Sequence, residues 1–495
     1  MAIDEVHIKI TKKGILMAGS REQFGSKLGF ILAAAGSAVG IGNLVGFPVG
    51  AAKNGGGAFL LMYAIFVVAI CLPVMIAEMT IGRSSQKDPL GALTKLSGGS
   101  PGWRVAGWLS IITPFMIAVF YLVITVWIFG YLAESAMGNL DILAQPETFS
   151  NFISGYDLFV YMGLVLAIVY LILQGGVKEG IEKAAKILMP ALFAMLLCLV
   201  AFVLTRDNAM AGVEFYLIPD FDKINASVVN AALSQAFFSL SLGMGIMITY
   251  GSYISKDADL PSSAKLVALT DTAVAFTAGL MILPAIFSFN PSVNPQELSE
   301  SSISMIFSYL PQIFLALQTS VGYFGASLIA CVFFLLVFFA AITSLVSIFE
   351  VPVASLMSEK GKSRKASLLI CGVLLLLFSL MCAFSFGWFD FFTSFISYGG
   401  SDKSFFDVVY DVFYDTILPL NGLLICLFVI YRWKKSGFNE ELEQGAPNFR
   451  NSFFERYVNF SLSTFIPLVL ALIFINTVAL KYFGFNIVEY VINLF

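Results

Sequence analysis

The sequence predicts an all-α integral membrane protein with eleven transmembrane helices, ten of which form a 5+5 inverted repeat. Two observations predict this fold. Of the 495 residues, 58% are hydrophobic and only 12% are charged, and apolar runs of roughly 20 residues, long enough to cross a bilayer, recur along the chain. The first and sixth of these runs are also interrupted by glycines, which predicts broken helices 1 and 6.

The predicted spans are 27–52, 57–82, 106–134, 157–174, 184–205, 231–254, 264–289, 323–356, 366–387, 405–433 and 458–483. They divide the chain into an N-terminal tail (1–26), a first repeat (27–205), a second repeat (206–434) and a last part with span 11 and a short tail (435–495). The apolar residues 484–495 are too few to cross again, so we expect them at the membrane interface. Segment 291–322 is either a short helical lid or a surface hairpin.

The basic residues predict the orientation. Of the 28 Lys and Arg residues, 23 lie in the N-terminal tail and in the loops on the same side of the predicted spans. By the positive-inside rule, the N-terminus is cytoplasmic and the C-terminus extracytoplasmic. We therefore expect a multi-pass protein of the cell (inner) membrane, with the lipid bilayer as a partner and no nucleic acid.

The first interruption, GSAVGIGNLVGFP, runs from Gly36 to Pro48 inside an apolar stretch. Lipid offers no hydrogen bonds, so irregular backbone at this depth persists only where it lines a cavity inside the protein. The alternative is a close-packed helix interface, because glycines at a spacing of four are common in membrane bundles.

The second interruption lies in SQAFFSLSLGMGIMITYGSY, where Gly243 and Gly245 divide span 6. Two broken spans at matching places of inverted halves indicate a transporter site near the bilayer midplane. An enzyme is not expected, because His7 is the only histidine, the six cysteines have no metal-like spacing and no nucleophile–base pair is visible. A channel selectivity filter would need symmetric loops from several subunits. Nothing in the sequence suggests such repeated symmetric loops.

Several segments together carry a family resemblance: AGSAVGIGNLVGFPVGAAKNGGGAF, Glu78, Gly82–Arg83, the region of Tyr121, FFSLSLGMG, Asp271–Thr272 and FFAAITS at 338–344. The chain resembles the bacterial neurotransmitter:sodium symporter family, and within it the bacterial leucine transporter and the multihydrophobic amino acid transporters. This resemblance implies a sodium-coupled secondary active symporter that works by alternating access. Spans 1, 2, 6 and 7 would move against a scaffold of spans 3–5 and 8–10.

The resemblance implies two sodium sites. The site farther from the substrate would use oxygens of Gly36, Val39, Ala340, Thr343 and Ser344. A Thr–Ser pair within the apolar run 332–349 fits this independently, although such hydroxyls also commonly bond back to their own helix. The other site would use Ala38, Asn43, Ser239 and Asp271, completed by the substrate carboxylate.

Asp271 is an ionisable residue within an apolar span, which is a functional hypothesis by default; the alternative is a residue near the helix end that reaches cytosolic water. Many relatives carry Asn at this place and bind chloride nearby. A carboxylate would supply the negative charge directly, so we expect no chloride requirement, although Tyr63, Gln235 and Ser239 keep a chloride-like polar setting.

By the same resemblance, the substrate site consists of Ser37, Ala38, Ile41, Gly42, Ile117, Tyr121, Phe238, Ser239, Ser241, Met244, Ser344 and Ile348. The Gly42 amide and the Tyr121 hydroxyl would hold a carboxylate. Gly40 stands where monoamine carriers of the family place Asp. The expected substrate is therefore a small zwitterion, and within that class a hydrophobic or aromatic L-amino acid. A biogenic or other small amine, or a sensor that does not transport, are the alternatives.

The predicted gates depart from the family pattern. Gly46 replaces an outer-gate Arg that relatives pair with an acid in span 10, here Asp411, so that this ion pair cannot form. At the inner gate, Arg21 and Tyr253 match, Phe24 replaces the usual Trp, and the partner acid falls on Ser358 with Glu359 beside it. The chain is expected to be a monomer or a weak homo-oligomer.

Overall fold

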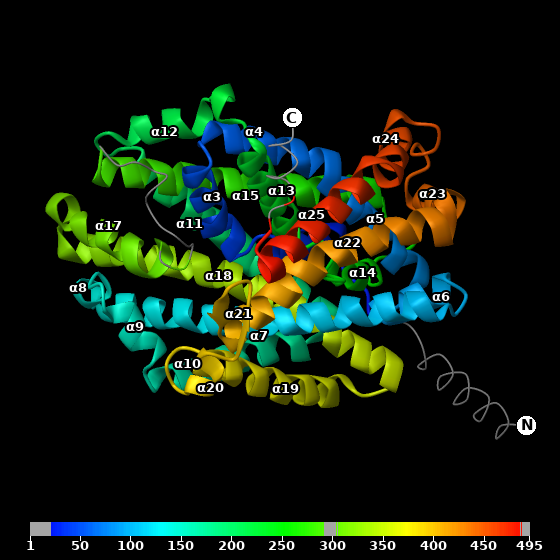
Figure 1. The fold of residues 1–495 in the computed structure, drawn as a ribbon, viewed down its shortest axis with the longest axis horizontal. Helices are drawn as coiled ribbons and strands as arrows, with labels where there is room; N and C mark the ends of the chain where they lie inside the picture. Colours follow the sequence, from blue (N-terminus) through cyan, green and yellow to red (C-terminus); the bar gives the residue numbers. More distant parts are fainter. Residues whose placement is uncertain (1–20, 292–302, 304, 486, 488–495) are drawn as a thin grey trace, which may run out of the picture.

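The computed structural model describes residues 21–291, 303, 305–485 and 487 (Figure 1). Most of the two terminal tails predicted from the sequence, and residues 292–302 and 304 of the predicted lid or hairpin, lie outside the described residues. Residues 305–316 of that segment are helical, and Met305, Ile306 and Phe307 are buried. The ring of Phe307 stacks on Phe149 at 4.8 Å. The described part of the segment is therefore a packed helix and not a surface hairpin.

The chain up to residue 225 forms α2 (Lys27–Ala38), η1 (Gly42–Gly46), α3 (Phe47–Lys53), α4 (Gly57–Phe66), η2 (Val67–Cys71), α5 (Leu72–Ser85), α6 (Pro89–Leu96), α7 (Pro101–Met137), α8 (Leu140–Leu143), α9 (Thr148–Ile153), α10 (Asp157–Gln174), η3 (Val177–Glu182), α11 (Lys183–Val203), α12 (Ala209–Leu217) and η4 (Phe221–Lys223). The remainder forms α13 (Ala226–Ser239), α14 (Ile246–Gly251), α15 (Leu260–Phe289), η6 (Met305–Tyr309), α17 (Leu310–Ala316), α18 (Gln318–Lys360), α19 (Arg364–Phe384), α20 (Asp390–Thr393), β1 (Ile396–Tyr398), β2 (Ser401–Lys403), α21 (Phe405–Val409), η7 (Tyr410–Ile417), α22 (Leu418–Leu427), η8 (Phe428–Trp433), α23 (Lys434–Gly445), α24 (Phe453–Ser463) and α25 (Phe465–Phe483).

The helices begin where the sequence provides caps. The side chains of Ser26, Asn225, Asp259 and Ser363 each accept a hydrogen bond from the backbone amide three residues later. Such caps satisfy one of the free N–H groups that every helix start exposes. They fix the starts of α2, α13, α15 and α19, and thereby the place at which each apolar run enters the bundle.

Nine helices in the described part of the chain are long and apolar enough to cross a membrane, and the bent pair of α2 with η1–α3 makes a tenth. They agree in order with the predicted spans. The predicted span 231–254 is formed by α13 and α14, which have 14 and 6 residues and are each too short to cross alone. The count of eleven and the inverted repeat stay predictions. One departure from an all-α fold is visible in these residues, the antiparallel hairpin β1–β2, in which Ile396 pairs with Lys403.

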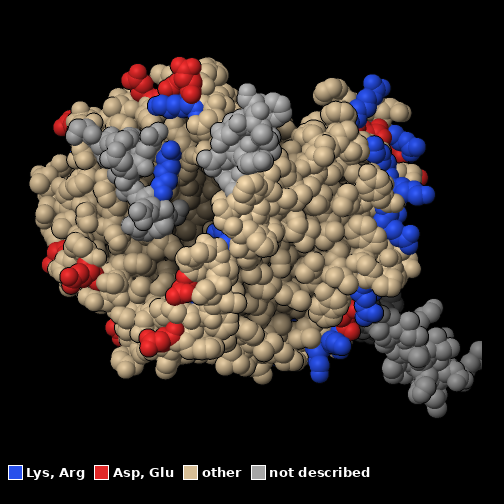
Figure 2. Space-filling model, in the orientation of Figure 1, with Lys and Arg blue, Asp and Glu red and all other residues tan. Residues whose placement is uncertain are grey.

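The two longest helices, α7 and α18, pack against each other along the bundle (Figure 1). The two broken segments, α2–η1 and α13–α14, lie beside α15 and α5, so that their interruptions face the interior. Lys and Arg gather mainly at the end of the molecule that carries α6, α23 and α24, and acidic residues gather at the opposite end (Figure 2). This separation of charge supports the predicted orientation.

Candidate functional site

The first break lies between α2 and η1, whose axes differ by 57°. Val39 leaves the helical conformation, with a ψ of 101°. The carbonyls of Gly36, Ser37 and Val39 are thereby free to bond elsewhere. This is the backbone opening that the glycines predicted.

Five oxygens predicted to hold one cation belong to this break and to α18, and we call them the neutral oxygen cluster: the carbonyls of Gly36, Val39 and Ala340 and the hydroxyls of Thr343 and Ser344. The hydroxyl of Ser344 lies 3.4 Å from the Gly36 carbonyl and 3.2 Å from the Val39 carbonyl. Thr343 instead bonds back within its own helix, to the carbonyls of Phe339 and Ala340 at 3.0 and 3.1 Å. The structure thus places Ser344 against the Gly36 and Val39 carbonyls, and Thr343 shows the back-bonding that was the alternative for the Thr–Ser pair.

The second group of oxygens surrounds a buried acid, and we call it the carboxylate cluster: Asn43, Tyr63, Ser239 and Asp271. The carboxylate of Asp271 accepts hydrogen bonds from the amide of Asn43 at 2.6 Å, from Ser239 at 2.8 Å and from Tyr63 at 3.2 Å. Asp271 is completely buried, so it does not reach cytosolic water. No ion pair among the described residues involves it.

A buried carboxylate without a cation is costly, even when donors surround it. The carboxylate cluster therefore has the chemistry of a cation site that combines one negative charge with neutral oxygens. The neutral oxygen cluster has no charge at all. Carbonyl and hydroxyl oxygens are the ligands that a hard cation prefers.

Several residues of the predicted substrate site contact the first break. The hydroxyl of Tyr121 accepts a hydrogen bond from the Ile41 amide at 3.3 Å. Ser241 donates to the Ser37 carbonyl at 3.1 Å, and Ser347, which the sequence interpretation did not include, donates to the Ser37 hydroxyl at 2.7 Å. The polar side of this site is thus formed by the broken backbone of α2 and by three elements that contact it.

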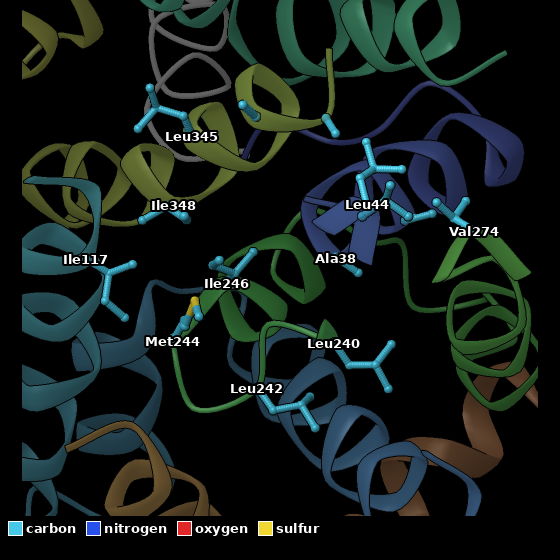
Figure 3. Packing of buried hydrophobic residues seen from close by; sticks show 14 of the residues in the cluster. Ala38, Leu44, Ile117, Leu240, Leu242, Met244, Ile246, Val274, Leu345 and Ile348 are labelled. Atoms are coloured by element: carbon cyan, nitrogen blue, oxygen red, sulfur yellow. The ribbon is translucent and has the colours of Figure 1, made fainter. Parts of the chain in front are cut away.

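Its apolar side is formed by residues from different parts of the chain. Ile117 comes from α7, Ile348 from α18, and Met244 from the break between α13 and α14 (Figure 3). All three are buried in the same core. Ala38 and Gly42 belong to the first break and complete the predicted set.

The second break depends on glycine at one place in particular. Gly243 has a φ of 76°, and a Cβ there would lie 2.5 Å from the Leu418 carbonyl, so only glycine fits. Its amide donates to the buried Glu78 at 2.7 Å, and its carbonyl accepts from Asn421 at 2.9 Å. Glu78 thus caps a backbone opening. Its position in an otherwise apolar span is the signal that could have suggested this role.

At one end of the site, Phe238 stacks on Tyr414 of η7 at 4.3 Å. Gln235, predicted to belong to the chloride-like setting, instead donates to the Gly42 carbonyl at 3.0 Å, and its amide lies 3.7 Å from the place of a Cβ at Gly46. Gly46 indeed offers no partner to Asp411. Asp411 is nevertheless ion-paired, with Lys481 of α25.

At the other end, Arg21 and Tyr253 contact each other as predicted, with the guanidinium 4.9 Å from the ring centre. The acid that contacts Tyr253 is Glu350, which accepts from its hydroxyl at 2.8 Å and pairs with Arg364 at 2.8 Å. The expected acid near Ser358 stays a prediction. A lone glutamate in the apolar run IFEVPV is the signal that the sequence interpretation missed.

A cavity of about 540 Å³ lies outside this site, between α11, α15, α17 and α18. Its lining is mostly apolar and includes Phe202, Phe289 and Phe333, with Arg206 and Asp207 also among its residues. None of the predicted substrate or cation residues lines it.

Two broken helices whose interruptions lie inside the bundle are the arrangement of a secondary transporter. The model of the sodium:neurotransmitter symporter family matches residues 21–149 and 154–493, and the chain belongs to this family. It is a sodium-dependent symporter of that family.

Three comparisons place it among known proteins. It is 34% identical over 468 residues to the uncharacterised sodium-dependent transporter YhdH of Bacillus subtilis, covering 93% of this chain and 98% of that protein. It is 28% identical to the sodium- and chloride-dependent taurine transporter of Bos taurus, over 59% of this chain and 54% of that protein. The crystal structure of MhsT in complex with L-phenylalanine superposes with a TM-score of 0.77 and 36% identity, covering 92% of this chain and 99% of MhsT.

Proposed function

We propose that this symporter imports an apolar or aromatic L-α-amino acid together with sodium, by alternating access and without chloride. The observation that carries the proposal is the position of Tyr121 against the first break, 3.3 Å from the Ile41 amide. A hydroxyl and a free helix end at one place form a site for a carboxylate, because helix N-termini carry partial positive charge.

The space around Gly40 supports an amino acid over an amine. A Cβ at Gly40 would lie 2.8 Å from the Tyr121 hydroxyl and 2.9 Å from the Ser344 hydroxyl. An aspartate at this position, as in monoamine carriers, would not fit without displacing both. The substrate's own carboxylate would therefore supply the negative charge that amine carriers build into the protein.

The side-chain end supports an apolar substrate. Ile117, Met244 and Ile348 are buried and carry no hydrogen-bonding group, and Met244 can adapt its shape to ligands of different size. MhsT, which is similar over nearly its whole length, was crystallised with L-phenylalanine. Both observations favour a hydrophobic or aromatic side chain.

The residues present fit two sodium ions. The neutral oxygen cluster would hold one ion with Gly36, Val39, Ala340, Thr343 and Ser344. The carboxylate cluster would hold the other with Ala38, Asn43, Ser239 and Asp271, together with the substrate carboxylate. Sodium would supply positive charge beside the substrate, so that substrate and ion bind more tightly together than separately.

The proposal of chloride independence is based on the acceptors to which the N–H and O–H donors of this region are already bonded. Tyr63 and Ser239 both donate to the Asp271 carboxylate, and Gln235 donates to the Gly42 carbonyl. A chloride ion would need these same N–H and O–H groups. With Asp271 in place, the negative charge is already present.

Alternating access requires that each end of the site closes in turn. At the inner end, the group of Arg21, Tyr253, Glu350 and Arg364 would hold the closed state, and Glu22 extends it with a contact of 3.6 Å to Arg364. We propose that this end faces the cytoplasm, with the N-terminus inside and the C-terminus outside, as the basic residues at that end favour (Figure 2).

The test is uptake of radiolabelled L-phenylalanine or L-leucine into proteoliposomes of the full chain, with sodium or potassium outside. We expect saturable uptake in sodium only, inhibited by apolar L-amino acids and not by the corresponding decarboxylated amines. Stronger inhibition by the amines would identify an amine carrier. Sodium-dependent binding without uptake would identify a sensor.

A further inference from the structure

The pair of Asp411 with Lys481 is part of a larger ion cluster between η7 and α25, near the extracytoplasmic end of the proposed orientation. The ammonium of Lys481 lies 2.7 Å from a carboxylate oxygen of Asp411 and 2.7 Å from one of Asp415. The hydroxyl of Tyr398 donates to the other oxygen of Asp411 at 2.9 Å. A single lysine thus serves two carboxylates of the same π-helix.

The burial of the cluster makes this lysine necessary. The side chains of Asp411 and Asp415 are 6% and 18% exposed, and that of Lys481 is 33% exposed. Removing the cation would leave two neighbouring carboxylates in a poorly solvated place, where their repulsion is large. The segment that carries them would then move toward water.

The next residue of α25 contacts the same segment. The hydroxyls of Tyr482 and Thr416 lie 3.1 Å apart, and Thr416 also donates to the Asp411 carbonyl at 2.7 Å. The end of α25 therefore fixes the stretch from Asp411 to Thr416 at several points.

Tyr414 lies inside this fixed stretch, immediately before Asp415. Its ring stacks on Phe238 at 4.3 Å, with an interplanar angle of 26°, and lies tilted against the ring of Tyr410 at 4.8 Å. Phe238 directly precedes Ser239, whose hydroxyl contacts Asp271. A chain of contacts therefore leads from Lys481 to the aromatic residue beside the candidate substrate and cation sites.

We propose that Lys481 is a positioning residue that, through Asp411 and Asp415, holds η7 so that Tyr414 positions Phe238 to close over the outer side of the site. The cation comes from α25, outside the two predicted repeats, and not from the first broken helix, where Gly46 has no side chain. Closure of the outer side thus depends on the last helix. That the site beneath binds substrate rests on the proposed function.

The test measures closure without any substrate. A reporter cysteine replaces Ile117 in the full chain, and its reaction with a membrane-impermeant thiol reagent is followed in sodium-containing proteoliposomes; the same chain without the reporter gives the background of the native cysteines. We expect Lys481→Met to speed labelling about tenfold. Lys481→Arg, which keeps the charge, should stay within twofold of the parent.

A double variant separates positioning from a loss of folding. Lys481→Met combined with Asp415→Asn keeps the net charge of the cluster at that of the parent and removes the repulsion between two carboxylates. Tyr414→Ala removes the ring that stacks on Phe238. If Lys481 acts through Tyr414, then Lys481→Met should add little to the labelling rate of Tyr414→Ala. In uptake assays, Lys481→Met should raise KM about tenfold with kcat within twofold.

Unchanged labelling in both Lys481→Met and the charge-compensated double variant, with a lowered unfolding temperature alone, would overturn the positioning role. Additive effects of Lys481→Met and Tyr414→Ala on the labelling rate would also overturn the positioning role. Labelling that changes as expected in a protein that takes up no amino acid would leave the positioning role intact and reject the proposed function.

Discussion

The two oxygen clusters lie on the same broken helix but differ in charge. The neutral oxygen cluster brings together carbonyls and hydroxyls from α2 and α18, with Ser344 between the carbonyls of Gly36 and Val39. The carboxylate cluster surrounds the buried Asp271 with three donors. A cation in the first cluster gains only from dipoles, whereas a cation in the second also neutralises a buried charge.

This difference in charge shows at which of the two clusters a negative charge contributes to cation binding. A cation and a carboxylate about 4 Å apart attract by roughly 4 kcal/mol at an effective dielectric constant of about 20. Dipolar ligands contribute less each, on the order of 1.5–3 kcal/mol for a hydrogen bond or similar contact to a charged group. Losing the carboxylate should therefore cost more than losing any single neutral ligand.

The largest effect is expected for Asp271→Asn. Loss of the buried charge should weaken sodium-dependent substrate binding on the order of 1,000-fold, because about 4 kcal/mol corresponds to nearly three powers of ten. Equilibrium binding of radiolabelled substrate at fixed sodium measures this. Chloride should recover part of the loss, since Tyr63 and Ser239 would then have free donors.

The matched control for this variant is Asp259→Asn, which makes the same chemical change at the start of the same helix, where the side chain accepts from the Ser262 amide. It should bind as the wild type does. Equal losses in the two variants would mean that the position of the charge does not matter, and the comparison between the clusters would fail.

A smaller effect is expected for Thr343→Ala in the neutral oxygen cluster. Removal of one hydroxyl ligand should raise the sodium concentration for half-maximal binding about tenfold. Thr343→Ser keeps the hydroxyl and should restore nearly normal sodium dependence. Chloride should have no effect on either variant; a rescue of Thr343→Ala by chloride would show that the two clusters do not differ as described.

The smallest effect is expected for Ser347→Ala. Its hydroxyl donates to the Ser37 hydroxyl at 2.7 Å. Ser347 therefore supports the broken segment through Ser37, without being a predicted ligand of the cation itself. The loss of one such hydrogen bond should weaken sodium-dependent binding about threefold. A loss as large as that of Thr343→Ala, measured in the same sodium titration, would place Ser347 among the direct ligands.

The sequence predicted those parts of the site that are marked by unusual residues within a single apolar span. Glycines mark both breaks, and polar residues within apolar spans mark Asp271, Thr343 and Ser344. The structure places Asp271 against Asn43 of the first break, and Ser344 against the carbonyls of Gly36 and Val39. The two sodium sites, the substrate and the chloride independence stay predictions.

The sequence could not predict pairings between distant residues. Lys481 pairs with Asp411 across 70 positions, and Tyr253 meets Glu350 across 97. No periodicity in either segment specifies its partner, and a lysine near the end of a span is ordinarily assigned to the interface. The π-helical turns η1 and η7 were missed for a related reason, because their i to i+5 bonds leave no distinct pattern of apolar residues.

The most direct test of the central claim is uptake by the wild-type protein with gluconate in place of chloride on both sides of the membrane. If Asp271 supplies the negative charge beside the cation, sodium-driven uptake should proceed at the same rate and with the same KM as in chloride. A collapse of uptake without chloride would contradict the account, because the compensating anion would then be a bound ion and not the carboxylate of Asp271.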